Sequence, residues 1–238
     1  MRVRNLNAPF DATSPVLRAC RPEQPDETCL RPDPTRGNIL SLESSGNDIK
    51  HNLELSVRKR FSIFNISTQY ELERVYGDVQ GGQGADASDN YDLARDWGRA
   101  PNPRHTIQTT VNARLPLGIF LTARMDANSG RYYSVRTGRD GNRDNNVNDR
   151  PPGVPPNSLR GPKFLDFDFN ISKAFFIGPP PVGGGVSQTN VNLFINMTNA
   201  FNRTNLRPPS GVMSSRNFGR STSAESPREI EVGVRFQF

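Results

Sequence analysis

The sequence predicts an all-β fold: an antiparallel meander of about seven or eight strands, forming an incomplete segment of a transmembrane β-barrel with long extracellular loops. Three observations support this prediction. Apolar and polar residues alternate in seven segments, short and long connections alternate between these segments, and the last segment ends on the aromatic residue Phe238.

Composition excludes two other classes of protein. Hydrophobic residues make up 34% of the 238 residues, which include 20 glycines and 20 prolines. No segment contains the roughly 18 consecutive apolar residues of a membrane-spanning helix. The net charge of +6 suggests a nucleic-acid partner, but the arginines are scattered through predicted loops and strand ends and form no basic stripe interleaved with aromatic residues. We therefore predict that the protein does not bind nucleic acid.

The alternation is clearest in the three C-terminal segments, residues 165–172, 190–197 and 229–238. In a strand, every second side chain points to the same face, so one face of each segment is apolar and the other polar. Phe194 interrupts the pattern of the middle segment. The residues that we predict to face lipid are Leu165, Phe167, Phe169, Ile171, Val191, Leu193, Ile195, Ile230, Val232, Val234 and Phe236.

Four further segments show the same alternation: residues 53–57, 64–73, 107–115 and 119–127. They pair as two hairpins, the first turning near residues 59–62 and the second at Pro116-Leu117-Gly118. The charged residues of the predicted strands fall on the polar register, except for Lys173, which lies near a strand end where its stem can extend to the headgroups. The polar-register charges are Glu71, Glu73, Arg124, Asp126, Asp166 and Asp168.

Connection lengths separate a membrane barrel from a soluble sandwich, because alternation alone fits both. The second, fourth and sixth strands are followed by connections of about 25 residues or more without predicted secondary structure, which a compact soluble domain seldom contains. Outer-membrane barrels combine short periplasmic turns with long external loops. We therefore expect residues 1–48 to form an extracellular loop region, residues 49–238 to form the barrel strands, and the long loops to lie near 77–103, 131–162 and 203–228.

The same arrangement orients the chain. With short turns in the periplasm, the last strand ends there, and Phe238 serves as the C-terminal signal for the barrel assembly machinery. Aromatic residues suit the interface rings of a barrel at both ends. The periplasmic candidates are Phe61, Phe64, Phe175, Phe176 and Phe236, and the outer candidates are Tyr132 and Tyr133.

Several motifs resemble the C-terminal barrel of TonB-dependent outer-membrane receptors, and most closely the Oar-like group with a carboxypeptidase-regulatory-like domain. They are Asn148-Asp149-Arg150-Pro151-Pro152-Gly153 with the segment continuing to Pro162, Leu165-Asp166-Phe167-Asp168-Phe169-Asn170-Ile171-Ser172-Lys173, Asn199-Ala200-Phe201-Asn202-Arg203-Thr204-Asn205, and the ending Pro227-Arg228-Glu229-Ile230-Glu231-Val232-Gly233-Val234-Arg235-Phe236. The resemblance covers almost the whole chain from about Asn5.

This resemblance implies a barrel of roughly 22 strands, plugged by an N-terminal domain and energised by the TonB complex. The remaining strands, the plug and the TonB box are absent from the sequence, and its first residues carry no secretory signal. We therefore expect a piece of a longer receptor in the bacterial outer membrane, which takes part in substrate uptake or binding and does not insert or transport alone. Its expected partners are outer-membrane lipid, the missing strands and plug, the TonB complex through the full-length receptor, and the assembly machinery.

Two pairs or groups of residues are candidate sites. Asp140, Asn142, Asp144 and Asp149 place oxygen ligands in one loop, as a calcium site requires, although an EF-hand would need Gly and Glu where Asn145 and Pro151 stand; the alternative is a solvated turn. Cys20 and Cys29 are close enough in sequence to form a disulfide in an oxidising compartment, and the alternative is two free thiols.

No residue pattern predicts an enzyme. His51 and His105 have no Ser, Cys or carboxylate partner at a recognisable spacing, and no organic cofactor is expected. The three prolines at 179–181 and three glycines at 183–185 predict a turn and not a phosphate loop, because no helix follows.

Two alternative functions remain open at this point. The first is a soluble or cell-surface β-rich adhesion domain whose apolar faces pack into a sandwich. The second is a small self-contained barrel of eight strands, if Ile39, Leu40 and Leu42 form an additional strand that closes the sheet.

Overall fold

The computed structural model describes residues 1–79, 85–178 and 189–238. The turn predicted for the three prolines at 179–181 and the three glycines at 183–185 lies outside the described residues. Within these ranges the chain forms β-strands and three short 3₁₀ helices, and no α-helix. None of the helices in the described residues has the length and apolar character to cross a membrane.

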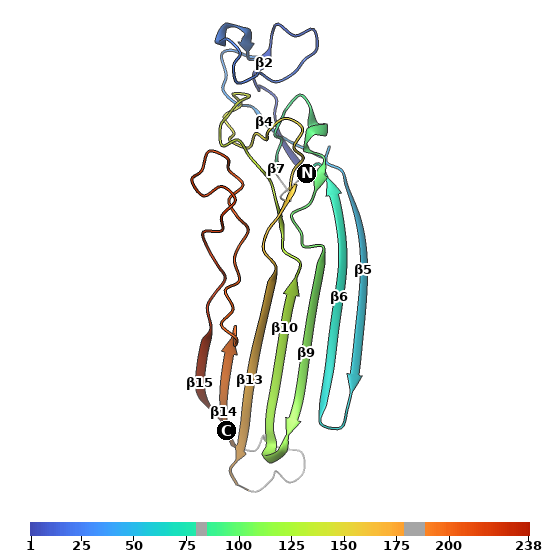
Figure 1. The fold of residues 1–238 in the computed structure, drawn as a ribbon, viewed down its shortest axis with the longest axis vertical. Coiled ribbons are helices and arrows are strands. Elements are labelled where there is room, and N and C mark those ends of the chain that lie inside the picture. Colours follow the sequence, from blue (N-terminus) through green and yellow to red (C-terminus); the bar gives the residue numbers. More distant parts are fainter. Residues whose placement is uncertain (80–84, 179–188) are drawn as a thin grey trace.

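Seven long strands form one antiparallel sheet in which neighbours in sequence are neighbours in space (Figure 1). Each strand alternates apolar and polar residues, so each forms an extended segment with two different faces. In order across the sheet they are β5 (Asp48–Arg60), β6 (Phe64–Gly77), β9 (His105–Leu115), β10 (Ile119–Asn128), β13 (Phe164–Phe176), β14 (Asn190–Thr198) and β15 (Glu229–Gln237). The short β8 (Gly98–Arg99) pairs with the far end of β6. The all-β antiparallel prediction is thus confirmed.

The two ends of the sheet differ as the connection lengths predict. Residues 61–63 and the 3₁₀ turn Pro116–Gly118 (η3) join hairpins at one end, which we call the turn end. Residues 78–104, 129–163 and 199–228 connect strands at the opposite end, the loop end. Figure 1 places the C-terminus at the turn end and the N-terminus at the loop end.

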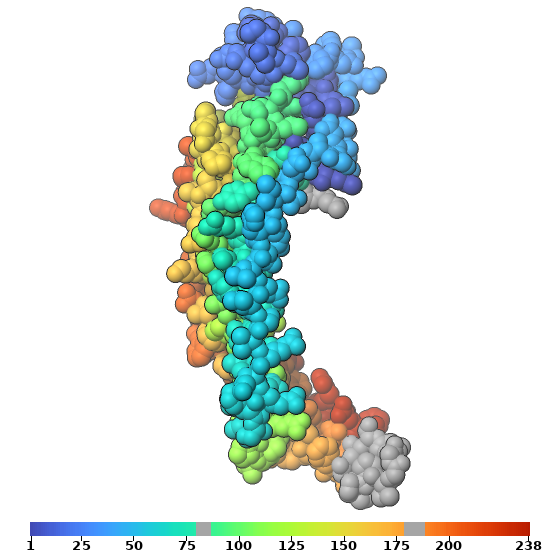
Figure 2. Space-filling view, turned by 90° about the vertical axis from the view of Figure 1, so that its right-hand side faces the viewer, coloured from blue at the N-terminus to red at the C-terminus, as the bar shows by residue number. Residues whose placement is uncertain are grey.

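The long connections and the N-terminal residues are not without structure, which corrects the expectation of loops lacking secondary structure. They contain the short strands β1 (Arg2–Asn5), β2 (Phe10–Asp11), β3 (Cys29–Leu30), β4 (Leu40–Glu43), β7 (Ala85–Asp86), β11 (Tyr132–Tyr133) and β12 (Leu159–Arg160), and the 3₁₀ turns η1 (Asp26–Thr28) and η2 (Leu93–Asp96). We call this assembly the loop cap. It forms the upper part of the molecule in Figures 1 and 2, above the bowed wall of the sheet.

The sheet is not closed in the described residues. The additional strand expected around Leu40 and Leu42 does form, as β4, but it pairs with β1 and leaves the main sheet unchanged, with Asn5 opposite Leu40. β1 in turn pairs with β7 in parallel, so these three strands make a separate sheet within the loop cap. The described residues therefore do not form the eight-stranded barrel of the second alternative, because β4 does not join β5 to β15.

The register places most of the apolar residues of the seven long strands on one face. Residues directly opposite one another in an antiparallel pair point to the same side of the sheet. One row crosses six strands and contains Phe64, Ala113, Leu121, Ile171, Ile195 and Val232. β5 joins this face through Leu53, Leu55 and Val57, which lie opposite Leu72, Tyr70 and Thr68.

This apolar face is not covered by a second sheet. Val232 is 74% exposed, Phe236 67% and Val57 62%, whereas the hydrophobic residues buried in the described chain are Ala8, Cys20, Ala87 and Tyr132. A soluble sandwich requires the opposite distribution, with the strand residues sealed in a common core. The described residues therefore do not form the sandwich of the first alternative.

Phe194, which interrupts the alternation, has a structural reason for its place on the polar face. It lies opposite Gly233 of β15, and a Cβ atom added at Gly233 would approach Phe194 Cζ to 2.2 Å. The ring therefore occupies the space that the glycine leaves free, with the guanidinium of Arg235 5.7 Å from the ring centre. Packing an aromatic ring over a glycine on a neighbouring strand stabilises sheet register.

We expect Gly233→Ala to lower the free energy of unfolding by about 1 kcal/mol, because the Phe194 ring must leave its position. In a Phe194→Leu background the same substitution should have a smaller effect, since the smaller side chain leaves room for the methyl group. Guanidinium unfolding in lipid vesicles, followed by circular dichroism, measures the loss in free energy of unfolding in each background. Equal losses in the two backgrounds would contradict this packing role.

Candidate functional site: the polar face and the loop cap

The polar face of the sheet carries a row of polar side chains that crosses six strands and contains two hydrogen-bonded stretches. The Asn112 amide donates to Asn65 Oδ1 (3.1 Å), and the Thr122 hydroxyl donates to Asn112 Oδ1 (2.9 Å). Further along the row, Asn170 donates to Asn196, and Asn196 donates to Glu231 Oε2 (2.8 Å). These short side chains occupy one register level from β6 to β15. This face is therefore built to contact water or polar groups.

Towards the loop end the polar face becomes acidic. Asp126 lies opposite Asp166, and Arg124 lies opposite Asp168, so three carboxylates gather around one guanidinium. Arg124 donates to Asp126 with its Nε 2.6 Å from Oδ2. On β5 and β6, Glu54 lies opposite Glu71. Paired like charges repel and need solvation, so this part of the face must remain in contact with water.

An open groove continues from these carboxylates into the last long loop. Asp126 and Asp166 line one part, and Arg207 and Glu225 line another. Arg207 forms a two-point contact with Glu225, both distances being 3.0 Å. The groove presents carboxylates, guanidinium groups and amides together, which suits a polar ligand.

The Asn199 to Asn205 motif fixes this loop against the strands. The buried Asn205 side chain accepts from the Leu165 N–H (3.1 Å) and donates to the Leu165 carbonyl (2.9 Å). The buried Asn199 amide donates to the carbonyls of Arg203 and Ser226. These asparagines satisfy backbone groups where strand pairing ends, so the resemblance motif has a structural role.

Phe201, between these asparagines, extends the apolar face and was not predicted to do so. Its ring meets Phe167 edge-on with centroids 5.0 Å apart and is 67% exposed. The sequence signal is weak, because Phe201 lies outside any alternating segment.

The loop cap is held together mainly by buried polar contacts. Arg2 is 1% exposed and forms an ion pair with Asp78 (3.1 Å). Asn90 accepts from the Asn5 N–H (2.6 Å) and donates to Asp144 Oδ2 (3.1 Å), so one side chain joins the N-terminal strand to two different loops. The loop cap thus forms an ordered surface at the loop end of the sheet.

A second polar centre joins the loops before β9 and before β13. The Asp96 carboxylate accepts from the Ser88 N–H (3.0 Å) and pairs with Arg150 (3.0 Å). Arg150 belongs to the motif beginning at Asn148, and it connects that motif to η2. Breaking such a buried ion pair would leave an uncompensated buried charge. The pair therefore holds the two loops in a fixed relative position.

The predicted calcium loop folds around its own backbone. Asp140 accepts from the backbone N–H groups of Asp144 and Asn145, and Asp149 accepts from Gly141. The Asn142 amide donates to Asp144 (3.1 Å). Among the described residues, no group of three His, Cys, Asp or Glu side chains is arranged to hold a metal ion. Calcium binding therefore stays a prediction, and the observed contacts are those of a turn-forming loop.

Cys20 and Cys29 are joined by a disulfide, with their Cα atoms 5.7 Å apart. It closes a loop beside the buried carboxylate of Asp11, which pairs with Arg18 (2.9 Å). Hydrogen bonds from Thr13, with further ones from Arg18 and Arg21, hold the pKa of Asp11 below its usual range. The far tip of the cap is therefore fixed by a covalent bond and a buried charge.

The remaining predicted residues keep the positions that their register implies. All positions predicted to face lipid lie on the apolar face. Lys173 lies on this face at the turn end, with its Nζ 4.8 Å from the centre of the Phe175 ring. Phe238 is 97% exposed at the turn end, and the His105 ring is hydrogen-bonded to the Tyr70 hydroxyl (2.8 Å).

Residues 148–231 match the family model described as an outer membrane beta barrel domain. The chain is an outer-membrane protein. The match covers β13 and β14 and reaches into β15, the strands with the clearest two-faced pattern. This outer-membrane protein is located in the bacterial outer membrane. No curated protein and no solved structure matches the chain.

Val232→Arg tests the assignment of faces in the outer-membrane protein. A cation in the middle of the lipid face should destabilise the inserted sheet by roughly 2 to 4 kcal/mol. Glu231→Arg, one residue away on the polar face, should have a smaller effect because water solvates it. Unfolding of the membrane-inserted protein measures the difference. A larger loss for Glu231→Arg would reverse the two faces.

The stability of the loop that contains Asp144 is expected to depend on pH. Burial, reinforced by the carboxylates of Asp140 and Asp149, raises the pKa of Asp144 to about 6. The folded loop therefore binds a proton more tightly than the unfolded chain, and its stability falls as the pH rises from about 4 to about 6. Hydrogen exchange of residues 140–149, corrected for intrinsic rates, should show an opening free energy about 1 to 2 kcal/mol lower at pH 7 than at pH 4.5.

Asp144→Asn supplies the control for this expectation, because it removes the titrating carboxyl and keeps its shape. The pH dependence of loop opening should flatten in this variant. A dependence as steep as that of the unmodified protein would assign the effect to other groups.

Proposed function

We propose that the chain forms the C-terminal barrel wall of a TonB-dependent outer-membrane receptor that binds or takes up a substrate. The observation that carries this proposal is the open sheet itself. Its apolar face suits lipid, its opposite face carries polar and acidic rows, and β5 and β15 are edge strands. An open edge in hydrocarbon leaves backbone groups without partners, so further strands must complete the wall.

The polar face supports a plugged interior for this wall. A small barrel fills its interior with its own side chains, whereas a large one encloses water or a separate domain. The short asparagine and threonine side chains of the polar row reach little beyond the sheet, so they leave space for such a domain. Their free hydrogen-bonding capacity suits a polar partner.

The loop cap and the acidic groove are the parts of the wall proposed to contact substrate. The groove runs from Asp126 and Asp166 to Arg207, which places charged groups where a solute enters from outside. The role is binding and passage without bond-making chemistry. The resemblance of the motifs near Asn148 and Asn199 to TonB-dependent receptors of the Oar-like group supports the same assignment.

The complete gene product should bind the periplasmic domain of TonB, which serves as the probe because the substrate is unidentified. We expect the complete reading frame to encode a plug and a TonB box before residue 1, and calorimetry should detect binding by the complete receptor. A receptor from which the predicted TonB box is deleted is the matched control and should give no heat. Absence of binding by the complete receptor would overturn the proposal.

A further inference from the structure

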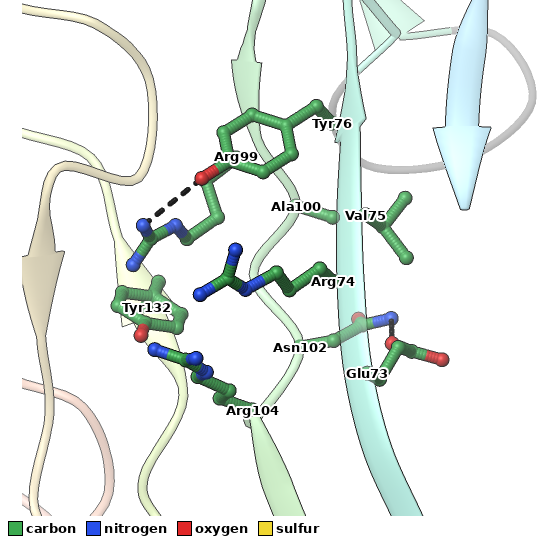
Figure 3. Close-up of a pocket in the computed structure, with 9 residues that line it drawn as sticks. All are labelled: Glu73, Arg74, Val75, Tyr76, Arg99, Ala100, Asn102, Arg104 and Tyr132. Carbon is green, nitrogen blue, oxygen red and sulfur yellow. Dashed lines mark hydrogen bonds between the residues drawn. The ribbon is translucent and has the colours of Figure 1, made fainter. Parts of the chain in front are cut away.

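Three arginines and two tyrosines lie together at the loop end of the apolar face (Figure 3), and Arg160 joins them through its contact with the Tyr132 ring. The group consists of Arg74, Arg99, Arg104, Arg160, Tyr76 and Tyr132, and we call it the rim cluster. Its members come from β6, β8, β11, β12 and the segment before β9. Segments far apart in sequence thus contribute cations to one place.

The register of β6 places the rim cluster on the lipid side of the wall. β5 and β6 pair without interruption from Asp48 opposite Gly77 to Arg60 opposite Asn65, so alternation along β6 is unbroken. Leu72, Arg74 and Tyr76 therefore share the apolar face. Arg99 lies directly opposite Tyr76 and shares it too. The rim cluster continues the apolar band outward from Leu72, at the level where hydrocarbon gives way to headgroups.

Aromatic rings hold the guanidinium groups in place. The Arg99 guanidinium lies 4.4 Å from the centre of the Tyr132 ring and 5.7 Å from that of Tyr76, and it donates to the Tyr76 hydroxyl (3.1 Å). The Arg160 guanidinium lies 5.4 Å from the centre of the Tyr132 ring. Cation–π contact orients a guanidinium while leaving most of its N–H donors free.

The charge of the rim cluster is not neutralised by the described residues. None of its four arginines takes part in the ion pairs of the described chain, whereas Arg2, Arg18 and Arg150 of the loop cap each have a carboxylate partner. The Nε of Arg104 is also buried without a hydrogen-bond partner. Several guanidinium groups that share one site without a carboxylate partner attract an anion from outside the chain.

The nearby carboxylate of Glu73 does not serve this purpose. Glu73 points to the polar face, where it pairs with Lys50 (2.6 Å) and accepts from the Asn102 amide. In Figure 3 its side chain extends away from the arginines. The sheet itself therefore separates the acidic side of the wall from the basic rim cluster.

We propose that the rim cluster binds the phosphate groups of an outer-leaflet glycolipid of the lipid A type, whose acyl chains lie along the apolar face below. Arginine suits this role because its planar fork makes two-point contacts with phosphate oxygens. A solute inside the barrel cannot reach the cluster, because the wall stands between them. The position next to the hydrocarbon band selects a ligand with a phosphate head and an apolar tail.

Binding of purified lipid A to the complete receptor in detergent tests this proposal, with chemically dephosphorylated lipid A and inorganic phosphate as comparison probes. Lipid A should bind at least about tenfold more tightly than its dephosphorylated form. Arg99→Gln with Arg160→Gln should remove most of this difference. Arg74→Gln, at an exposed arginine that takes part in none of the ion pairs of the described residues, should reduce it. Arg216→Gln with Arg220→Gln, on the last long loop, is the matched control and should leave binding unchanged.

Circular dichroism of every variant checks that the β-structure is retained. Equal binding of the two lipid A forms, or unchanged binding in both rim variants, would overturn the proposal. Displacement of lipid A by inorganic phosphate at similar concentration would also overturn it, since the site would then recognise a free anion. Failure of the TonB test leaves this outcome unaffected, because the rim cluster depends only on the outer-membrane location.

Discussion

The sheet separates two media with a single layer of backbone, and the rest of the structure depends on this constraint. Each long strand that lies between two others satisfies its backbone groups by pairing with them, so only its side chains contact the surroundings. Because alternate residues point to opposite faces, a single segment of about ten residues specifies both an apolar surface and a polar one. The row from Phe64 to Val232 and the row from Asn65 to Glu231 lie one residue apart along β6 and β15. A shift of register by one residue would exchange them.

The loop cap obeys a different rule. It contains few buried hydrophobic residues, and side-chain amides and ion pairs hold it together. Asn7 shows the principle, since its buried amide donates to the carbonyls of Asp33, Arg36 and Gly37. In irregular backbone, such contacts supply the partners that a sheet would otherwise provide. The cap can therefore be ordered in water without a large apolar core.

The sequence predicts the wall well and the cap poorly, for a physical reason. Strand pairing follows a local period of two, which is visible in residues 229–238 without knowledge of any other segment. The contact between Asn5 and Asn90 joins residues far apart in sequence and follows no period. The rim cluster shares this difficulty, although Arg74 continues the apolar register beyond Leu72 and so gave a readable signal. Tyr132 was expected at the outer rim, but its burial beneath arginines depends on residues from separate loops. For the same reason β4 formed where expected yet paired with β1.

The unequal ends of the sheet have a consequence for biogenesis. In the proposed orientation, with the loop end outside, each long connection must cross the hydrocarbon layer from the periplasm before the two strands beside it can span the membrane. The asparagines and paired charges that later lock the cap would then travel unfolded and hydrated, since their partners sit on other connections. The long connections must therefore cross the membrane before the loop cap folds. Tight turns such as Pro116–Gly118 remain on the side from which the chain enters, so they are free to form first.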